Sequence, residues 1–123
     1  MHVVVTAKHA LRVGAPIVVE GASPQPPLVG VFEDDGSTGY LYALDRRHKD
    51  QPILDALHIY NVASVTDRTK ESSVEIGWSR DGLKVALLIN GIAHAIYDFA
   101  SSKGYRRLEN DSEIDSAAIE LFP

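Results

Sequence analysis

Hydrophobic and polar residues alternate most regularly between residues 74 and 99, and this alternation predicts the centre of a β-sheet. Two dipeptides interrupt the pattern, Asp81-Gly82 and Asn90-Gly91. Both are typical of the two-residue type I′ turns of β-hairpins, because the two central positions of that turn need positive φ. The segment is therefore expected to form three antiparallel strands joined by tight turns, a β-meander.

The two turns fix which residues are expected to lie opposite each other. Ile76 should lie opposite Leu87 in the first hairpin, and Leu87 opposite His94 in the second. Because opposed residues share a face of the sheet, one face is predicted to be apolar and to include His94. The members of this face are Val74, Ile76, Trp78, Leu83, Val85, Leu87, Ile89, Ile92, His94 and Ile96.

Shorter runs of β-branched and aromatic residues predict further strands earlier in the chain. These runs lie at residues 3–6, 17–20, 28–33 and 40–44. The last two flank a glycine-containing loop that is typical of a longer hairpin turn. A proline-rich connector at residues 23–27 separates the second and third runs, and it is too poor in backbone donors for a central strand.

A first short helix is predicted after Pro52. Proline is favoured in the first turn of a helix, and Asp50 or Gln51 would be the N-cap. Apolar residues within 53–61 then follow helical spacing, although residues 58–62 could equally be extended.

A second short helix is predicted over residues 112–121, with Ser112 as its N-cap. Its apolar face would dock on the sheet and consists of Ile114, Ala117, Ala118 and Leu121. The predicted fold class is therefore α+β, a single domain over residues 1–123. It combines an antiparallel β-meander sheet of about five to seven strands with one or two short packed helices.

Composition and charge limit the functions that are compatible with this fold. The 123 residues include no cysteine, which excludes disulfides, thiolate nucleophiles and cysteine-based metal sites. Lys and Arg number 12 against 17 Asp and Glu, a formal charge of −5 that disfavours nucleic acid and suits a basic partner. No signal peptide and no apolar run of about 18 residues is found, so a cytoplasmic protein without membrane association is expected.

Several blocks between residues 28 and 105 are similar to a bacterial protein family. The blocks are Val31-Phe32-Glu33-Asp34-Asp35-Gly36, Thr38-Gly39-Tyr40, Tyr42-Ala43-Leu44-Asp45, Ile53-Leu54-Asp55-Ala56-Leu57-His58-Ile59-Tyr60-Asn61-Val62, Trp78-Ser79-Arg80-Asp81-Gly82-Leu83-Lys84 and Leu87-Leu88-Ile89-Asn90-Gly91, with His94-Ala95 and Asp98-Phe99. They resemble the family catalogued as domain of unknown function 2251. The resemblance implies no activity, and it implies a family pattern that ends soon after Gly104-Tyr105. As a small bacterial α+β domain, the chain also looks like the immunity proteins of toxin systems. This likeness is an analogy based on size and fold class.

The candidate catalytic residues are His94, Asp98, His58 and Asp55. A histidine on an apolar face is either a general base or ligand residue, or a structural side chain that hydrogen-bonds a carboxylate or carbonyl. Asp98 shares the strand of His94 but lies too far along it for direct pairing. Asp55 and His58 would be three residues apart on the first helix, close enough for either an acid–base pair or a plain surface contact.

The acidic run Glu33, Asp34 and Asp35 is the candidate partner-binding site. Its spacing does not match a calcium-binding EF-hand loop, so no metal is expected, and no motif for a cofactor is present. A solvated hairpin tip that contacts a basic protein is the better interpretation.

Two functions are compatible with these observations. The first is a protein-interaction module without catalytic activity, including an immunity-type protein that binds and neutralises a basic partner. The alternative is a small enzyme or small-molecule binder with a pocket near His94 and Trp78, and a solvent-connected cavity with converging polar groups would favour it.

Overall fold

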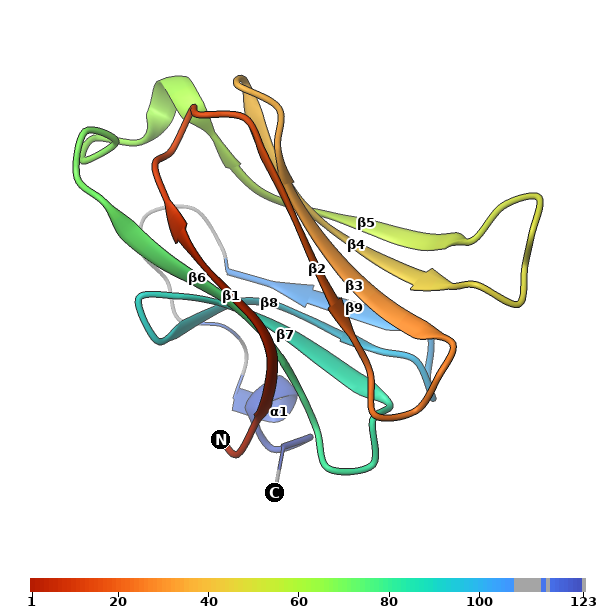
Figure 1. Cartoon of the computed structure of the whole chain (residues 1–123). Coiled ribbons are helices and arrows are strands. Elements are labelled where there is room, and N and C mark those ends of the chain that lie inside the picture. The colour runs from red at the N-terminus through yellow and green to blue at the C-terminus, as the bar shows by residue number, and fades with distance from the viewer. Residues whose placement is uncertain (108–113, 115, 123) are drawn as a thin grey trace.

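The computed structural model describes residues 1–107, 114 and 116–122, and it consists of two antiparallel sheets (Figure 1). The five-stranded sheet has the order β1-β6-β7-β8-β9 and the four-stranded sheet has the order β2-β3-β4-β5. The elements are β1 (Val4–Leu11), β2 (Ile17–Ala22), β3 (Leu28–Asp34), β4 (Thr38–Asp45), β5 (Ile53–Asn61), the 3₁₀ turn η1 (Val62–Ser64), β6 (Ser72–Trp78), β7 (Lys84–Ile89), β8 (Ile92–Asp98), β9 (Lys103–Arg106) and the helix α1 (Ser116–Ile119).

The main hydrophobic core lies between the two sheets. Leu11, Val74, Ile76, Trp78, Val85 and Leu87 enter it from the five-stranded sheet. Val19, Leu28, Phe32, Leu41, Ala43 and Leu57 enter it from the four-stranded sheet. Each strand alternates residues toward this core with residues away from it, as strand geometry requires. The protein is therefore a β-sandwich.

The α+β prediction is wrong, because the segment expected to form the first helix is the strand β5. Its partner is β4, with Leu57 opposite Leu41 at the core. The register of this pair shifts twice, which leaves Leu54 and Ile59 as extra residues on β5. A β-bulge of this kind interrupts the period of two. The apolar residues of β5 consequently fall at spacings of three and four, and these spacings imitate a helix.

The predicted second helix is reduced to α1, which has four residues. Ser112, its proposed N-cap, lies outside the described residues. Ile114 and Ala118 are buried as predicted, together with Phe122. They pack on the outer face of the five-stranded sheet, against Ala86, Leu88, Ala93 and Ile96. Figure 1 shows α1 beside this sheet, near both chain ends.

The predicted strand runs at residues 17–20, 28–33 and 40–44 lie within observed strands, and the run at 3–6 overlaps β1 from Val4 onward. The register of the first predicted hairpin is also confirmed, with Ile76 opposite Leu87 and Trp78 opposite Val85.

The register predicted for the second hairpin is wrong beyond its first pairs. Leu87 lies opposite Ala95, and the register shifts by one residue between Leu87 and Leu88. His94 is the extra residue at this shift, so it lies on a β-bulge. The bulge reverses the faces of the strand that follows it. Tyr97 enters the main core, while Ile96 joins the outer face beneath α1.

Candidate functional site

Asp34, predicted to lie at an exposed acidic tip, is buried with 1% of its surface exposed. Its Oδ2 accepts hydrogen bonds from the Tyr60 hydroxyl at 2.6 Å and the Gly14 amide at 2.7 Å. Its Oδ1 accepts a bond from the Gly36 amide at 2.8 Å. These bonds join the β1–β2 turn, the β3–β4 turn and β5. The role of Asp34 is structural, because a carboxylate enclosed in this way cannot reach a partner.

Asp35 and Glu33 do lie at the surface. Asp35 is exposed, and its Oδ1 accepts bonds from the Ser37 and Thr38 amides, each at 2.8 Å. These two backbone bonds lower the pKa of Asp35, so the residue is negatively charged at neutral pH. Glu33 is half-buried and points away from the core, because Phe32 and Asp34 beside it point inward.

The four candidate catalytic residues do not come together. Asp98 is buried, and its carboxylate accepts bonds from the Ala100 amide and the Ser101 hydroxyl, both at 2.9 Å. It therefore closes the turn between β8 and β9. His94 is half-buried on its bulge, with Nε2 3.1 Å from Nη1 of Arg107.

Asp55 and His58 point to opposite faces of β5. They are three residues apart with regular pairing between them, opposite Ala43 and Tyr40. The helical pairing proposed for them is therefore absent. His58 instead has Nε2 2.9 Å from Oδ1 of Asn61.

Trp78, proposed to line a pocket with His94, is fully enclosed in the main core. Its ring stacks on Phe99 with centroids 5.6 Å apart, and its Nε1 donates to the Gly21 carbonyl oxygen at 3.3 Å. An indole with no exposed surface cannot contact a ligand in this conformation.

Aromatic, acidic and aliphatic side chains lie together on the outer face of the four-stranded sheet. Strand pairing aligns them in two rows across β2, β3, β4 and β5. One row is Val18, Glu33, Tyr40 and His58, and the other is Glu20, Val31, Tyr42 and Ala56. We call these eight residues the open face, since every one of them is exposed or half-buried.

Aromatic contacts hold the centre of the open face in one arrangement. The rings of Tyr40 and Tyr42 stack with centroids 5.9 Å apart, and the His58 ring meets Tyr40 edge-on at 5.3 Å. Val18 at the β2 edge has 62% of its surface exposed. The open face is thus a preformed surface of rigid, amphipathic side chains, which lose little conformational entropy when they contact a partner.

The charge around the two tyrosines is negative. Partial desolvation raises the pKa of Tyr42, and the Glu33 carboxylate raises it further, followed by Tyr40 and Asp35. Glu20 extends the acidic character to β2, where it also forms an ion pair with Arg46. A phenol so placed stays protonated and is a hydrogen-bond donor at neutral pH.

The two outer faces of the sandwich differ in what covers them. On the five-stranded sheet, Ile114, Ala118 and Phe122 pack over the small and aliphatic residues. On the four-stranded sheet, Val18 is exposed and Tyr40 and Tyr42 are half-buried. The five-stranded sheet also has exposed apolar residues, which are Val4, Val5 and Ile92. The stacked tyrosine pair therefore distinguishes the outer face of the four-stranded sheet.

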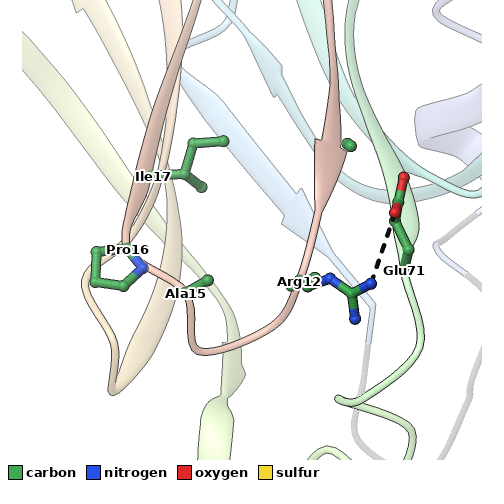
Figure 2. Close-up of a pocket in the computed structure, with 6 residues that line it drawn as sticks. Arg12, Ala15, Pro16, Ile17 and Glu71 are labelled. Carbon is green, nitrogen blue, oxygen red and sulfur yellow. Dashed lines mark ion pairs between the residues drawn. The ribbon is translucent and has the colours of Figure 1, made fainter.

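A shallow pocket of about 240 Å³ lies at the turn between β1 and β2. Its lining is Ala10, Arg12, Ala15, Pro16, Ile17 and Glu71. Figure 2 shows Arg12 facing Glu71, with Nη2 3.8 Å from Oε2. Both side chains are more than half exposed, so this ion pair is well solvated and contributes little free energy. Nothing in the lining directs a buried polar group at a ligand.

The sequence analysis did not choose the two tyrosines as candidate site residues, although it predicted their strand. Tyr40 and Tyr42 are two residues apart, which places both on one face. Their spacing was the available signal, and it does not reveal whether that face is covered.

Among the described residues, no group of three or more acidic or histidine side chains is arranged to hold a metal ion. Within the same residues, no helix has the length and hydropathy needed to cross a membrane.

Comparison with known proteins identifies relatives but no activity. A family described as "Uncharacterized protein conserved in bacteria (DUF2251)" matches residues 11–118. The family resemblance drawn from the sequence is thereby confirmed, and the match extends well past Tyr105. A protein of Haemophilus influenzae named "Uncharacterized protein" is 52% identical over 75 residues, which are 61% of this chain and 47% of that protein. The chain thus aligns with about half of that relative's length, and no solved structure matches it.

Proposed function

Since this chain belongs to the DUF2251 family of uncharacterized bacterial proteins, whose description names no activity, we propose its function from its surface. We propose that it is a non-catalytic protein-binding domain and that its partner docks on the open face through basic side chains. The immunity-type role suggested by the sequence is one version of this proposal, in which the basic partner is a toxin.

One observation carries the proposal: a stacked, half-buried tyrosine pair lies on the outer face of the four-stranded sheet, whereas the C-terminal segment packs on the outer face of the other sheet. Tyrosine is enriched at protein interfaces and among the residues that dominate binding energy. Tyr40 and Tyr42 lie at the centre of the open face, with Val31 opposite Tyr42 and Val18 two strands away from Tyr40. This mixture of an aromatic centre and a polar rim is typical of a binding surface.

The charge of the surface supports a basic partner. Glu33 lies opposite Tyr40, and Asp35 follows at the adjacent turn. The whole chain carries a formal charge of −5. Lysine or arginine side chains of a partner would meet carboxylates at the rim and aromatic rings at the centre, where cation–π contacts form.

The alternative of an enzyme or small-molecule binder near His94 and Trp78 gains no support from the described residues. Trp78 is fully enclosed. Asp98 and Asp55 lie on different elements and are engaged in turn or backbone contacts.

The proposal is tested by selecting short randomised peptides, displayed on phage, against the immobilised chain. We expect the selected sequences to be rich in lysine and arginine. Binding should weaken by about tenfold or more when Tyr40 and Tyr42 are both replaced by Ser, because interface tyrosines carry a large share of binding energy.

The matched control is Tyr105→Ser, which removes a half-buried tyrosine from the five-stranded sheet. It should leave the affinity of the selected peptides nearly unchanged. A selection that yields only peptides insensitive to the Tyr40 and Tyr42 replacements would refute the proposal.

A further inference from the structure

The sandwich has four edge strands, and three of them carry features that discourage pairing with another strand. The register of β1 shifts between Val5 and Ala7, and that of β5 shifts twice. β9 has only four residues. Bulges and short length are the usual protections of exposed edges. β2 has neither, since its six residues pair with β3 without interruption.

The hydrogen-bonding direction of β2 can be derived from its neighbours. The Ser23 amide donates to the Leu28 carbonyl oxygen at 2.9 Å, so this opposed pair is of the hydrogen-bonded class. Hydrogen-bonded pairs alternate along an antiparallel ladder. Ile17, Val19 and Gly21 therefore bond to β3, and the backbone groups of Val18, Glu20 and Ala22 point away from it.

The pairing of β3 with β4 confirms this alternation independently. The Asp35 amide donates to the Thr38 carbonyl oxygen at 3.1 Å, and the Arg46 amide donates to that of Pro27 at 3.3 Å. Odd-numbered residues of β3 thus bond to β4, which leaves the even-numbered ones for β2.

The outward backbone groups of β2 have no backbone partner in the part of the chain that the structure describes. β1 comes close to β2 near Gly21, where Thr6 lies over it, but β1 pairs with β6. The side chains of Val18, Glu20 and Ala22 are all exposed. β2 therefore offers a flat, regular edge whose exposed side chains belong to the open face or adjoin it.

We propose that the partner binds β2 as an added β-strand, through an extended basic segment; this inference rests on the proposed function. The added strand would extend both rows of the open face. One of its residues would lie beside Val18, and another beside Glu20 would be lysine or arginine. Main-chain bonds would supply affinity, and alternate side chains would supply specificity.

A second copy of the chain fits this edge less well than a basic segment. Antiparallel pairing of two β2 strands centred on Glu20 places Val18 opposite Ala22 and Glu20 opposite its own copy. Each Glu20 already forms an ion pair with its own Arg46, so this contact supplies no new opposite charge. The formal charge of −5 on each copy opposes such an association, whereas it attracts a basic segment.

The test uses the peptides selected on the intact chain. Amide hydrogen exchange of the chain is measured by NMR with and without peptide. We expect the amides of Val18, Glu20 and Ala22 to exchange rapidly in the isolated chain and to become protected in the complex. The Val18→Pro variant removes one outward donor without breaking the ladder to β3. It should weaken binding by about tenfold, as the loss of a main-chain bond implies.

The matched comparison is Val18→Thr, which changes the side chain but keeps the amide donor, so it should weaken binding clearly less than Val18→Pro does. If Val18→Pro fails to fold, the amide exchange measurement alone tests whether the partner adds a strand to β2. Tyrosine-dependent binding with no protection of the three amides would overturn strand addition but leave the proposed function standing. Peptides insensitive to the Tyr40 and Tyr42 replacements would refute both. Protection already present in the isolated chain, with the mass of a dimer, would assign the edge to a second copy and overturn the inference.

Discussion

The Tyr60 hydroxyl donates a 2.6 Å hydrogen bond to Oδ2 of Asp34, and this bond ties β5 to the end of β3. The ring of Tyr60 also packs edge-on against Phe32 in the main core, with centroids 6.2 Å apart. Burial raises the pKa of Tyr60 strongly, and its bond to the Asp34 carboxylate raises it further. The pair therefore consists of a protonated phenol and its acceptor.

We predict that Asp34→Ala destabilises the fold by about 3 kcal/mol or more, because three donors lose their buried acceptor. Tyr60→Phe should cost less, about 1–2 kcal/mol, since only one bond is lost. Urea denaturation measures both. The matched control is Asp35→Ala, which removes the exposed neighbour and should cost far less than Asp34→Ala. Equal costs at the two positions would contradict the structural role of Asp34.

A second prediction concerns the bulge at His94. Deleting His94 would remove the extra residue and leave a regular ladder in which Leu87 still lies opposite Ala95. Ala95 and Tyr97 therefore keep their places in the core, and we expect a loss of only about 1 kcal/mol or less. Deleting Ile96 instead removes a fully buried side chain and should cost about 3 kcal/mol or more, as urea denaturation would show. A His94 deletion as costly as the Ile96 deletion would contradict the placement of the bulge at His94.

A third prediction compares two glycines with positive φ. Gly82 and Gly91 have φ values of 72° and 79°. A Cβ at Gly82 would lie 2.7 Å from side-chain atoms of Ser23 and Gln25, whereas a Cβ at Gly91 would have no atom within 4 Å. Gly91→Ala should therefore cost about 1 kcal/mol from backbone strain alone. Gly82→Ala should cost clearly more, as thermal or urea unfolding would reveal. The reverse order would contradict the packing of the proline-rich connector on this turn.

A fourth prediction concerns pH. Hydrogen bonds from Arg47 hold the pKa of Asp45 at about 2, below its ordinary value of 3.8. A carboxyl with a lowered pKa in the folded state stabilises the fold above its ordinary value, and this contribution disappears as the pH falls toward about 2. Arg47→Ala should return the pKa of Asp45 toward 3.8, as NMR titration of the carboxyl would show.

The stability difference between Arg47→Ala and the parent chain should accordingly be largest near neutral pH and vanish at the acid end. Arg46→Ala is the matched control, because Arg46 pairs with Glu20 instead. It should leave the titration of Asp45 unchanged. An Asp45 pKa that is the same with and without Arg47 would contradict the bidentate pairing.

The strands and the first hairpin could be predicted because their signals are local. Alternation from Val74 to Trp78, and the turn that follows, suffice to align Ile76 with Leu87. The bulges at His94, Leu54 and Ile59 have no comparable signature, since an extra residue leaves the composition of a strand unchanged. One unseen bulge inverts every later residue of its strand. Two such bulges made β5 resemble a helix.

The candidate site could be predicted only in part, for a similar reason. The acidic residues at 33–35 were predicted to form one exposed tip, but Asp34 is buried by contacts with Tyr60 and Gly14, which are 26 and 20 residues away in the chain. The open face could not be predicted because the pattern of a strand does not tell which face of a sheet another segment covers. Tyr40 and Tyr42 have the spacing of one strand face, and the structure shows that they are half-buried on the outer face.

The most direct test of the account maps the surface that a selected peptide contacts. Backbone amide shifts of the chain are recorded by NMR as the peptide is added. We expect the largest changes on β2, β3 and β4, at Val18, Glu33, Tyr40 and Tyr42, with little change on β7 or α1. Changes concentrated instead at the Arg12–Glu71 pocket or on the outer face of the five-stranded sheet would contradict the assignment of the open face as the binding surface.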